Sequence, residues 1–202
     1  EELTKDIRAR QHEFDNHMNA ILNMHVTIDN YDELVKAQSA YGRGIYDDRS
    51  RCNSSLLRIS DKILAGFLYS KLIGAPEYAQ IDIQVLSQEI VTSVSEHSLV
   101  EIIGVLVDNA FEAATPEHGR VEMILDSKDD KLIFAIKNQV ENLTMGEIAH
   151  FFERGFTTKN NREGRGLGLY QANRIALSHN GEIAVELLEN AGVQEICFRV
   201  EI

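Results

Sequence analysis

The spacing of the apolar residues changes once along this chain, near residues 73–80, and this change limits the possible folds more than any other feature. In the first segment apolar side chains recur every three or four residues, at Leu3, Ile7, Phe14, Ile21, Met24 and Ile28. That heptad spacing is typical of the buried seam of a helical bundle. Beyond Pro76, one of only two prolines, short segments alternate apolar and polar residues as strands do. The sequence therefore predicts two domains, residues 1–75 and 76–202.

The first domain is predicted to be an antiparallel helical hairpin. Its first helix ends at "DNYDEL" (29–34), where Asp32 is a suitable N-cap for the next helix. The second helix, which we expect to be interrupted near "YGRG" (41–44), resumes through Cys52, Leu56, Ile59, Ile63 and Phe67. Two helices alone bury little apolar surface. We therefore expect a homodimer, in which two hairpins form a four-helix bundle.

The second domain is predicted to be an α/β sandwich, so the whole chain belongs to the α+β class. Helices are expected at 98–114 and at 169–179, the latter ended by Gly181, and strands at 80–85, 120–125, 131–138, 182–188 and 195–202. In the last strand the residues Ile196, Phe198, Val200 and Ile202 all fall on one side. This alternation predicts a sheet with one face covered by helices.

Composition narrows the function. The chain of 202 residues has a net charge of −12, which argues against a nucleic-acid partner, because phosphate backbones require a basic surface. Cys52 and Cys197 lie far apart without metal-binding spacing, which favours reduced, buried thiols in a cytosolic protein. No apolar run approaches the roughly 20 residues of a membrane span. The chain opens on "EELTKD" without methionine, so we expect it to be the soluble piece of a longer protein.

A glycine-rich loop, "GRGLGLY" (164–170), opens a predicted helix. Gly164, Gly166 and Gly168 stand at alternate positions, which lets backbone N–H groups approach a phosphate chain at a helix N-terminus. The loop differs from the G-x-G-x-x-G of dinucleotide-binding folds, and no Walker lysine follows the last glycine. A tight turn without a ligand is the alternative.

Two other segments carry candidate ligand-binding residues. In "LVEIIGVLVDNAFEAA" (99–114) the polar residues Asp108, Asn109 and Glu112 form one face. A solvated face is the simplest interpretation, but a mid-helix Asn between apolar residues usually holds a ligand, and its amide oxygen suits Mg²⁺ carrying ATP phosphates. The segment "FFERGFTTK" (151–159) and the residues after it contain Lys159, Arg162 and Arg165, whose positive charges can neutralise a triphosphate. The alternative is that its two phenylalanines simply anchor a loop.

Together these motifs resemble the Bergerat-type ATP-binding domain that DNA gyrase, heat-shock chaperones, histidine kinases and MutL share. "DNAFEA" resembles the N-box, "FFERGFTTK" the F-box and "GRGLGLY" the G2 box of that superfamily. "HEFDN", which begins at His12, resembles the H-box of sensor histidine kinases. Within that family the sequence is most similar to the citrate and dicarboxylate sensors and to the peptide-pheromone quorum-sensing receptors.

The resemblance implies ATP-dependent autophosphorylation on His12, transfer to an Asp of a response regulator, and phosphatase activity toward that regulator. The heptad register points His12 away from the bundle core, and the adjacent Glu13 can fix its tautomer and take its proton. Asn16, one turn on, would position water for dephosphorylation, although a plain surface amide is its alternative. His17 falls on the seam as a packing residue, and His25 is assigned no role.

ATP and Mg²⁺ are the implied cofactors. The implied ligand-binding residues are Asn109, which would also hold Mg²⁺ through the phosphates, with Asp108, Glu112, Asn138, Lys159, Gly164, Arg165, Gly166, Gly168 and Leu169. Val105 stands where many relatives have Asn or Glu, so the carboxylate base that simple ATP hydrolysis requires is absent there. The D-x-G-x-G box is absent too, and Asn138 takes the place of its Asp, where an amide oxygen can accept from the adenine amine.

Two other functions stay open at this point. One is a degenerate histidine phosphotransfer or scaffold protein without ATP turnover, and the other is a gyrase-like ATPase or an anti-sigma kinase acting on serine, which has no use for the hairpin. The histidine kinase interpretation places the chain on the cytoplasmic side of a cell-membrane receptor, tethered through an N-terminal sensor region that this sequence lacks.

Overall fold

The computed structural model describes residues 16, 19–45, 56, 59–87, 89–157, 166–190 and 192–202. Several residues singled out above lie outside this range: His12, Glu13, His17, Cys52, Lys159, Gly164 and Arg165. The chain divides into two compact units, Glu1–Arg49 and Ser50–Ile202.

The first unit contains two helical segments, residues 19–27 and α2 (Tyr31–Ile45). Asn30 accepts hydrogen bonds at its Oδ1 from the backbone N–H groups of Asp32 (2.9 Å) and Glu33 (3.4 Å), so Asn30 caps α2 and the predicted Asp32 cap is wrong. The predicted interruption at 41–44 is also wrong, because α2 runs through both glycines. A glycine inside a helix costs only about 1 kcal/mol, which neighbouring turns tolerate. The hairpin and the four-helix bundle remain predictions.

The second unit is built on a five-stranded mixed sheet. Its strands are β1 (Gln80–Val85), β2 (Arg120–Lys128), β3 (Lys131–Val140), β4 (Glu182–Asn190) and β5 (Val193–Glu201), in the order β1-β2-β3-β5-β4. β1 runs parallel to β2, and the other neighbours are antiparallel. All five predicted strands are confirmed, each within a few residues of its expected ends.

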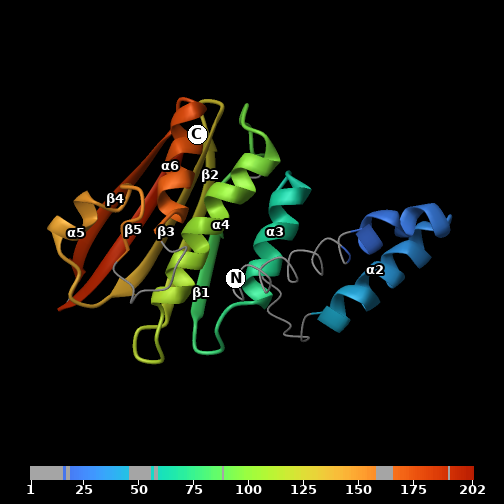
Figure 1. The fold of residues 1–202 in the computed structure, drawn as a ribbon, viewed down its shortest axis with the longest axis horizontal. Coiled ribbons are helices and arrows are strands. Elements are labelled where there is room, and N and C mark those ends of the chain that lie inside the picture. Colours follow the sequence, from blue (N-terminus) through green and yellow to red (C-terminus); the bar gives the residue numbers. More distant parts are fainter. Residues whose placement is uncertain are drawn as a thin grey trace, which may run out of the picture. The chain divides into compact units, whose positions relative to one another are not determined.

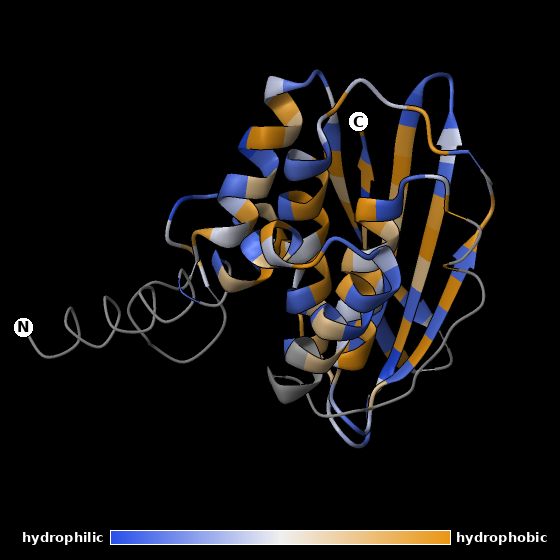
Figure 2. Cartoon of the chain, turned by 90° about the vertical axis from the view of Figure 1, so that its right-hand side faces the viewer, coloured by the Kyte–Doolittle hydropathy of each residue, from blue (hydrophilic) through white to orange (hydrophobic). Residues whose placement is uncertain are grey.

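Three helices cover one face of this sheet: α3 (Lys62–Ile73), α4 (Glu96–Ala113) and α6 (Gly168–Ser178) (Figure 1). Figure 2 shows the apolar residues of helices and strands turned toward each other between the two layers. α4 supplies Ile102, Ile103 and Leu106 to this core, and the strands supply Val121 and Phe134 among others. The predicted sheet with one face covered by helices is confirmed.

A short helix lies between β3 and α6, where the sequence patterns predicted no helix. α5 (Met145–Ala149) is held by a capping box, in which Glu147 N–H donates to Thr144 Oγ1 (3.2 Å) and Thr144 N–H donates to Glu147 Oε2 (2.9 Å). α5 is too short for its apolar residues to repeat at helical spacing, but the sequence contains the T-x-x-E pattern of its capping box.

The helix α3 packs in the core of the second unit. Leu64, Leu68 and Leu72 are buried in the core around α4, and the division between the compact units falls after Arg49. The expected boundary, between 75 and 76, therefore falls after a helix that shares the core of the sheet unit. The change of periodicity marks where strands begin, and it does not show where a helix before them packs.

The open face of the sheet carries a ladder of charged side chains. Glu122 on β2 accepts from Lys137 on β3 (2.8 Å) and from Arg120 (2.5 Å), and Lys137 also pairs with Glu195 on β5 (3.5 Å). Lys137 and Arg120 hold the pKa of the Glu122 carboxyl below its usual range. The half-buried thiol of Cys197 lies on the same face without a disulfide, and burial raises its pKa.

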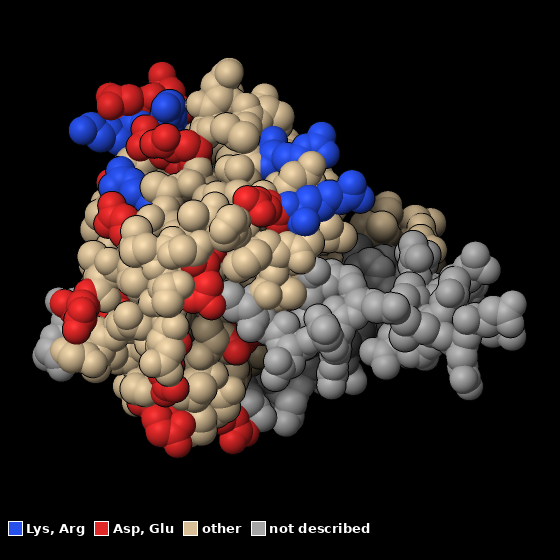
Figure 3. Space-filling model, turned by 60° about the vertical axis from the view of Figure 1, so that its left-hand side comes forward, with Lys and Arg blue, Asp and Glu red and all other residues tan. Residues whose placement is uncertain are grey.

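Charge is unevenly spread over the surface that Figure 3 shows. Lysine and arginine gather near its upper part, and the charged residues of its lower part are acidic. Among the residues described, no helix has the length and apolar character needed to cross a membrane.

The lowered pKa of Glu122 sets a pH dependence of stability. Because the folded-state pKa lies below the unfolded value of about 4.3, the stabilisation is present above that value and is lost as the pH falls through the folded pKa. Glu122→Gln should lower the free energy of unfolding by about 1 kcal/mol at pH 7, and the difference should fade in acid. Urea unfolding at pH 7 and pH 3 measures this. In a Lys137→Met background the Glu122→Gln effect should shrink, and an undiminished effect would contradict the ion-pair explanation.

Candidate functional site

A cavity of about 280 Å³ opens between α4, the ends of β3 and β5, the segment after α5 and the start of α6. Its lining is mostly apolar with a few polar groups. The lining residues are Asn109, Glu112, Ala113, Asn138, Val140, Leu143, Phe151, Phe156, Thr157, Gly166, Gly168, Leu169, Ile196 and Phe198. An apolar cavity with a few convergent polar groups is the usual form of a small-molecule site.

Four polar residues line this cavity: Asn109, Glu112 and Asn138 from two regular elements, and Thr157 from the segment after α5. Asn109 and Glu112 lie on α4, three residues apart and thus on one face of the helix. Asn138 lies on β3, where it is only 3% exposed and pairs in register with the apolar Val121 and Ile196. Its Nδ2 donates to the backbone oxygen of Gln139 (3.0 Å). This bond uses one of the two N–H donors of the Asn138 side-chain amide.

A glycine turn closes one side of the cavity. Gly166 has a φ of +88°, and its carbonyl oxygen accepts from Gly155 N–H (2.9 Å). A Cβ at Gly166 would lie 2.6 Å from the Gly155 carbonyl carbon and from the Phe156 oxygen, so only glycine fits this crossing. α6 begins soon afterwards at Gly168, and its N-cap residue Leu167 makes no side-chain capping hydrogen bond. The first N–H groups of a helix have no partner within the helix and can bind an anionic group.

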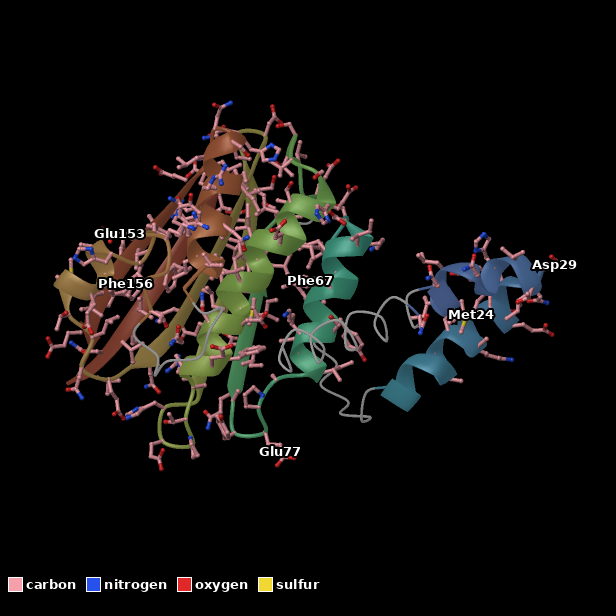
Figure 4. The ribbon with its side chains drawn as sticks, in the orientation of Figure 1. Met24, Asp29, Phe67, Glu77, Glu153 and Phe156 are labelled. Atoms are coloured by element: carbon pink, nitrogen blue, oxygen red, sulfur yellow. The ribbon has the colours of Figure 1, made fainter. Side chains whose placement is uncertain are left out.

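Aromatic rings form another wall. Phe151 stacks on Phe198 with 6.0 Å between ring centroids, and Phe156 lies 6.1 Å from Phe151. His150 lies 5.7 Å from Phe156 on its other side. Figure 4 shows Phe156 beside the sheet, near α5. These contacts hold the segment 151–156 against β5. This segment includes Gly155, whose N–H bonds to Gly166 in the glycine turn.

The structure brings together six of the residues proposed from sequence: Asn109, Glu112, Asn138, Gly166, Gly168 and Leu169. Asp108 is not among them. Its carboxylate pairs with Lys71 on α3 (2.6 and 2.7 Å), because successive helical residues point about 100° apart. The sequence showed a polar face on α4 but not which neighbour each polar residue meets. Asn16, the one described residue of the H-box, is an exposed helical residue of the first unit.

Some lining residues were not assigned a role from sequence. Ile196 and Phe198 follow from the alternation of β5, because they lie on its covered side. Val140 and Leu143 lie where β3 ends and the chain turns toward α5, and no pattern marked them. The side chain of Gln194 on β5 holds Leu143 there, because it bonds to both backbone groups of that residue (3.1 and 3.3 Å).

The described residues contain no cluster of three or more His, Cys, Asp or Glu side chains suited to a metal ion.

An apolar cavity beside a helix N-terminus and a glycine turn is an arrangement that suits a phosphate-bearing ligand. The chain belongs to the family described as histidine kinase-, DNA gyrase B-, and HSP90-like ATPases, whose profile matches residues 94–202. The matched range contains all the residues that line the cavity.

Relatives of known name extend the similarity over most of the chain. Sensor histidine kinase DcuS of Escherichia coli is 29% identical over 188 residues, which cover 89% of this chain and 33% of DcuS. Sensor histidine kinase CitA of Klebsiella pneumoniae is 26% identical over 195 residues, 92% of this chain and 34% of CitA. This chain thus spans about a third of the length of these relatives.

Solved structures share the fold. A mycobacterial sensor histidine kinase, MprB, superposes with a TM-score of 0.55 at 19% identity, covering 69% of this chain and 93% of that one. The catalytic domain of histidine kinase ThkA superposes with a TM-score of 0.55 at 17% identity, covering 70% and 91% of the two chains.

The glycine turn can be tested by paired substitutions. Gly155 and Gly166 both have positive φ, but a Cβ at Gly155 meets nothing within 4 Å. Gly155→Ala should therefore cost only the backbone strain, about 1 kcal/mol. Gly166→Ala should cost at least about 2 kcal/mol more, because its Cβ cannot fit without moving backbone. Urea unfolding compares the two variants, and equal losses would show that the close crossing does not constrain the turn.

Proposed function

We propose that this chain is the catalytic portion of a sensor histidine kinase, which phosphorylates His12 from ATP and passes the phosphoryl group to an Asp of a response regulator. The observation that carries this proposal is the cavity itself, where Asn109, Asn138 and the start of α6 converge in a member of an ATPase family. The similarity to sensor histidine kinases supports it, since that similarity reaches far beyond the ATPase region.

The cavity suits a nucleotide in both size and chemistry. Its volume lies near the lower end of the range for small-molecule sites, and its apolar and aromatic walls fit a purine ring. In this proposal the buried Asn138 oxygen accepts from the adenine amine, and the free N–H groups at the start of α6 receive phosphate oxygens. Asn109 holds Mg²⁺ through the phosphates, and Glu112 lies one turn farther along the same face. Lys159, Gly164 and Arg165 would complete the phosphate contacts.

The acceptor chemistry belongs to the H-box. A neutral His12 imidazole attacks the γ-phosphorus with its Nε2 lone pair, a P–N bond forms, and the bond to the β-phosphate oxygen breaks with release of ADP. Glu13 accepts a hydrogen bond from Nδ1–H, which fixes the nucleophilic tautomer and stabilises the positive charge that develops on the ring. Val105 supplies no base for water, so the nucleotide is held for transfer rather than hydrolysis.

The same proposal assigns the partners. The phosphohistidine donates to a response regulator, and Asn16 on the exposed face of its helix positions water when the regulator is dephosphorylated. A homodimer would bring two hairpins together as a four-helix bundle. The relatives are sensor kinases about three times as long, which supports a parent protein anchored in the cell membrane with this portion in the cytoplasm.

The acceptor assignment has a direct test. Incubation with Mg-ATP should label the protein with a phosphate that is labile in acid and stable in base, as a phosphoramidate is. His12→Gln should abolish the label, whereas His17→Gln, the matched control one turn away, should retain it. Labelled peptides identified by mass spectrometry check the position. Label retained in the His12 variant would refute the assignment, and label on serine would favour a kinase of the anti-sigma type.

The role of Asn109 predicts a loss of affinity without a change of shape. Asn109→Asp has the same size but places a negative charge beside the phosphates, so nucleotide affinity should fall at least tenfold, or about 1.4 kcal/mol. Isothermal titration with Mg-ADP measures it. Gln80→Glu, which adds the same charge at the exposed start of β1, is the control and should leave affinity unchanged.

An unchanged affinity in Asn109→Asp would remove that residue from the site. A wild-type chain that binds no nucleotide at all would favour the phosphotransfer or scaffold function instead.

A further inference from the structure

Two adjacent rows of α4 face different neighbours. Gly104 and Asp108, one turn apart, face α3, where they meet Phe67 and Lys71. Val105 and Asn109, the next residues in each case, face α6 and the cavity, since Val105 Cγ1 lies 3.2 Å from the Cβ position of Gly168. The same turn of α4 therefore holds the nucleotide site on one side and α3 on the other.

The contact with α3 is closely fitted. Gly104 has no side chain, and a Cβ there would lie 3.2 Å from Phe67 Cζ, so the ring packs directly against the helix backbone (Figure 4). Lys71 Nζ lies 2.6 and 2.7 Å from the two carboxylate oxygens of Asp108 and 5.5 Å from the centre of the Phe67 ring. We call these four residues, Phe67, Lys71, Gly104 and Asp108, the α3–α4 joint.

The position of α3 in the sequence suggests a role for the α3–α4 joint. The chain passes from the first unit into the second at Ser50, and α3 is the helix on this route that packs against the core. In sequence, residues 62–73 thus lie between the segment that carries His12 and the elements that form the cavity. A displacement of α4 at Asn109 also displaces the adjacent residue Asp108. Closely packed helices shift between discrete packing arrangements instead of deforming continuously.

We propose that the α3–α4 joint couples the docking of α3 to the occupancy of the nucleotide cavity, with Lys71 and Asp108 as positioning residues that act through Asn109. This inference rests on the proposed function, because it takes nucleotide as the occupant. Coupling of this kind is reciprocal: whatever factor the nucleotide adds to the docking of α3, the docking adds to nucleotide affinity. In this proposal, nucleotide binding in the second unit can thereby influence the segment that carries the acceptor, through α3.

The test uses the full 202-residue chain and amide hydrogen exchange of residues 62–73 with and without Mg-ADP. In the wild type, nucleotide should slow exchange of the α3 amides by about fivefold, the low end of usual coupling factors. Lys71→Met and Asp108→Asn should each reduce this change to less than twofold and weaken Mg-ADP binding by a matching factor. Lys71→Arg, which keeps the charge, should restore both.

Two further variants exclude simpler explanations. Gly104→Ala crowds Phe67 without altering any charge and should also reduce the change in exchange, which a purely electrostatic effect on the phosphates would not do. Lys131→Met removes the Lys131–Glu201 ion pair (3.4 Å) on the sheet and should leave both readouts at wild-type values. Urea unfolding of each variant verifies that it remains folded.

The outcomes separate the two proposals. A wild type that binds Mg-ADP with unchanged exchange in α3 overturns the coupling and leaves the kinase proposal standing. Variants that retain the full fivefold change overturn it as well. A wild type that shows no nucleotide binding overturns both. Binding and coupling without any label on His12 overturn only the assignment of the acceptor.

Discussion

The burial of α4 is the constraint on which the second unit depends. Its apolar face, with Ile102, Ile103 and Leu106 wholly buried, is fixed against the sheet, so the directions of its remaining residues are fixed as well. One remaining row meets α3, and the next meets α6 and the cavity. The packing of α4 on the sheet thus decides which of its residues reach the cavity and which reach α3.

The cavity is formed by elements far apart in sequence, and each contributes a different chemistry. β3 and β5 supply apolar side chains and one buried amide, the segment after α5 supplies aromatic rings, and the start of α6 supplies uncapped backbone donors. The glycine turn joins two of these parts, because the Gly155–Gly166 hydrogen bond ties the aromatic segment to the start of α6. In the proposed function, side chains would recognise the base and backbone groups would recognise the phosphates.

Sequence patterns predicted the regular parts of this fold well and its junctions poorly. Alternation in segments such as 195–202 identified every strand, because each strand has one covered face, and the residue types of "DNAFEA" and "GRGLGLY" pointed to five lining residues. The N-cap of α2 was harder to predict, because Asn30 and Asp32 are both suitable residue types and only the observed hydrogen bonds distinguish them. The packing of α3 and the partner of Asp108 depend on contacts between distant residues, which periodicity does not encode.

The sheet order places β1 and β4 at the two edges. Along β4 the chain reads "EIAVELLEN", with glutamates at 182, 186 and 189 and no basic residue. Two such edges brought side by side would set like charges against each other, and charged edges of this kind oppose strand-to-strand joining between molecules. The glutamates of β4 therefore oppose pairing of this edge between two copies of the chain, so that an encounter of two copies at β4 does not extend the sheet.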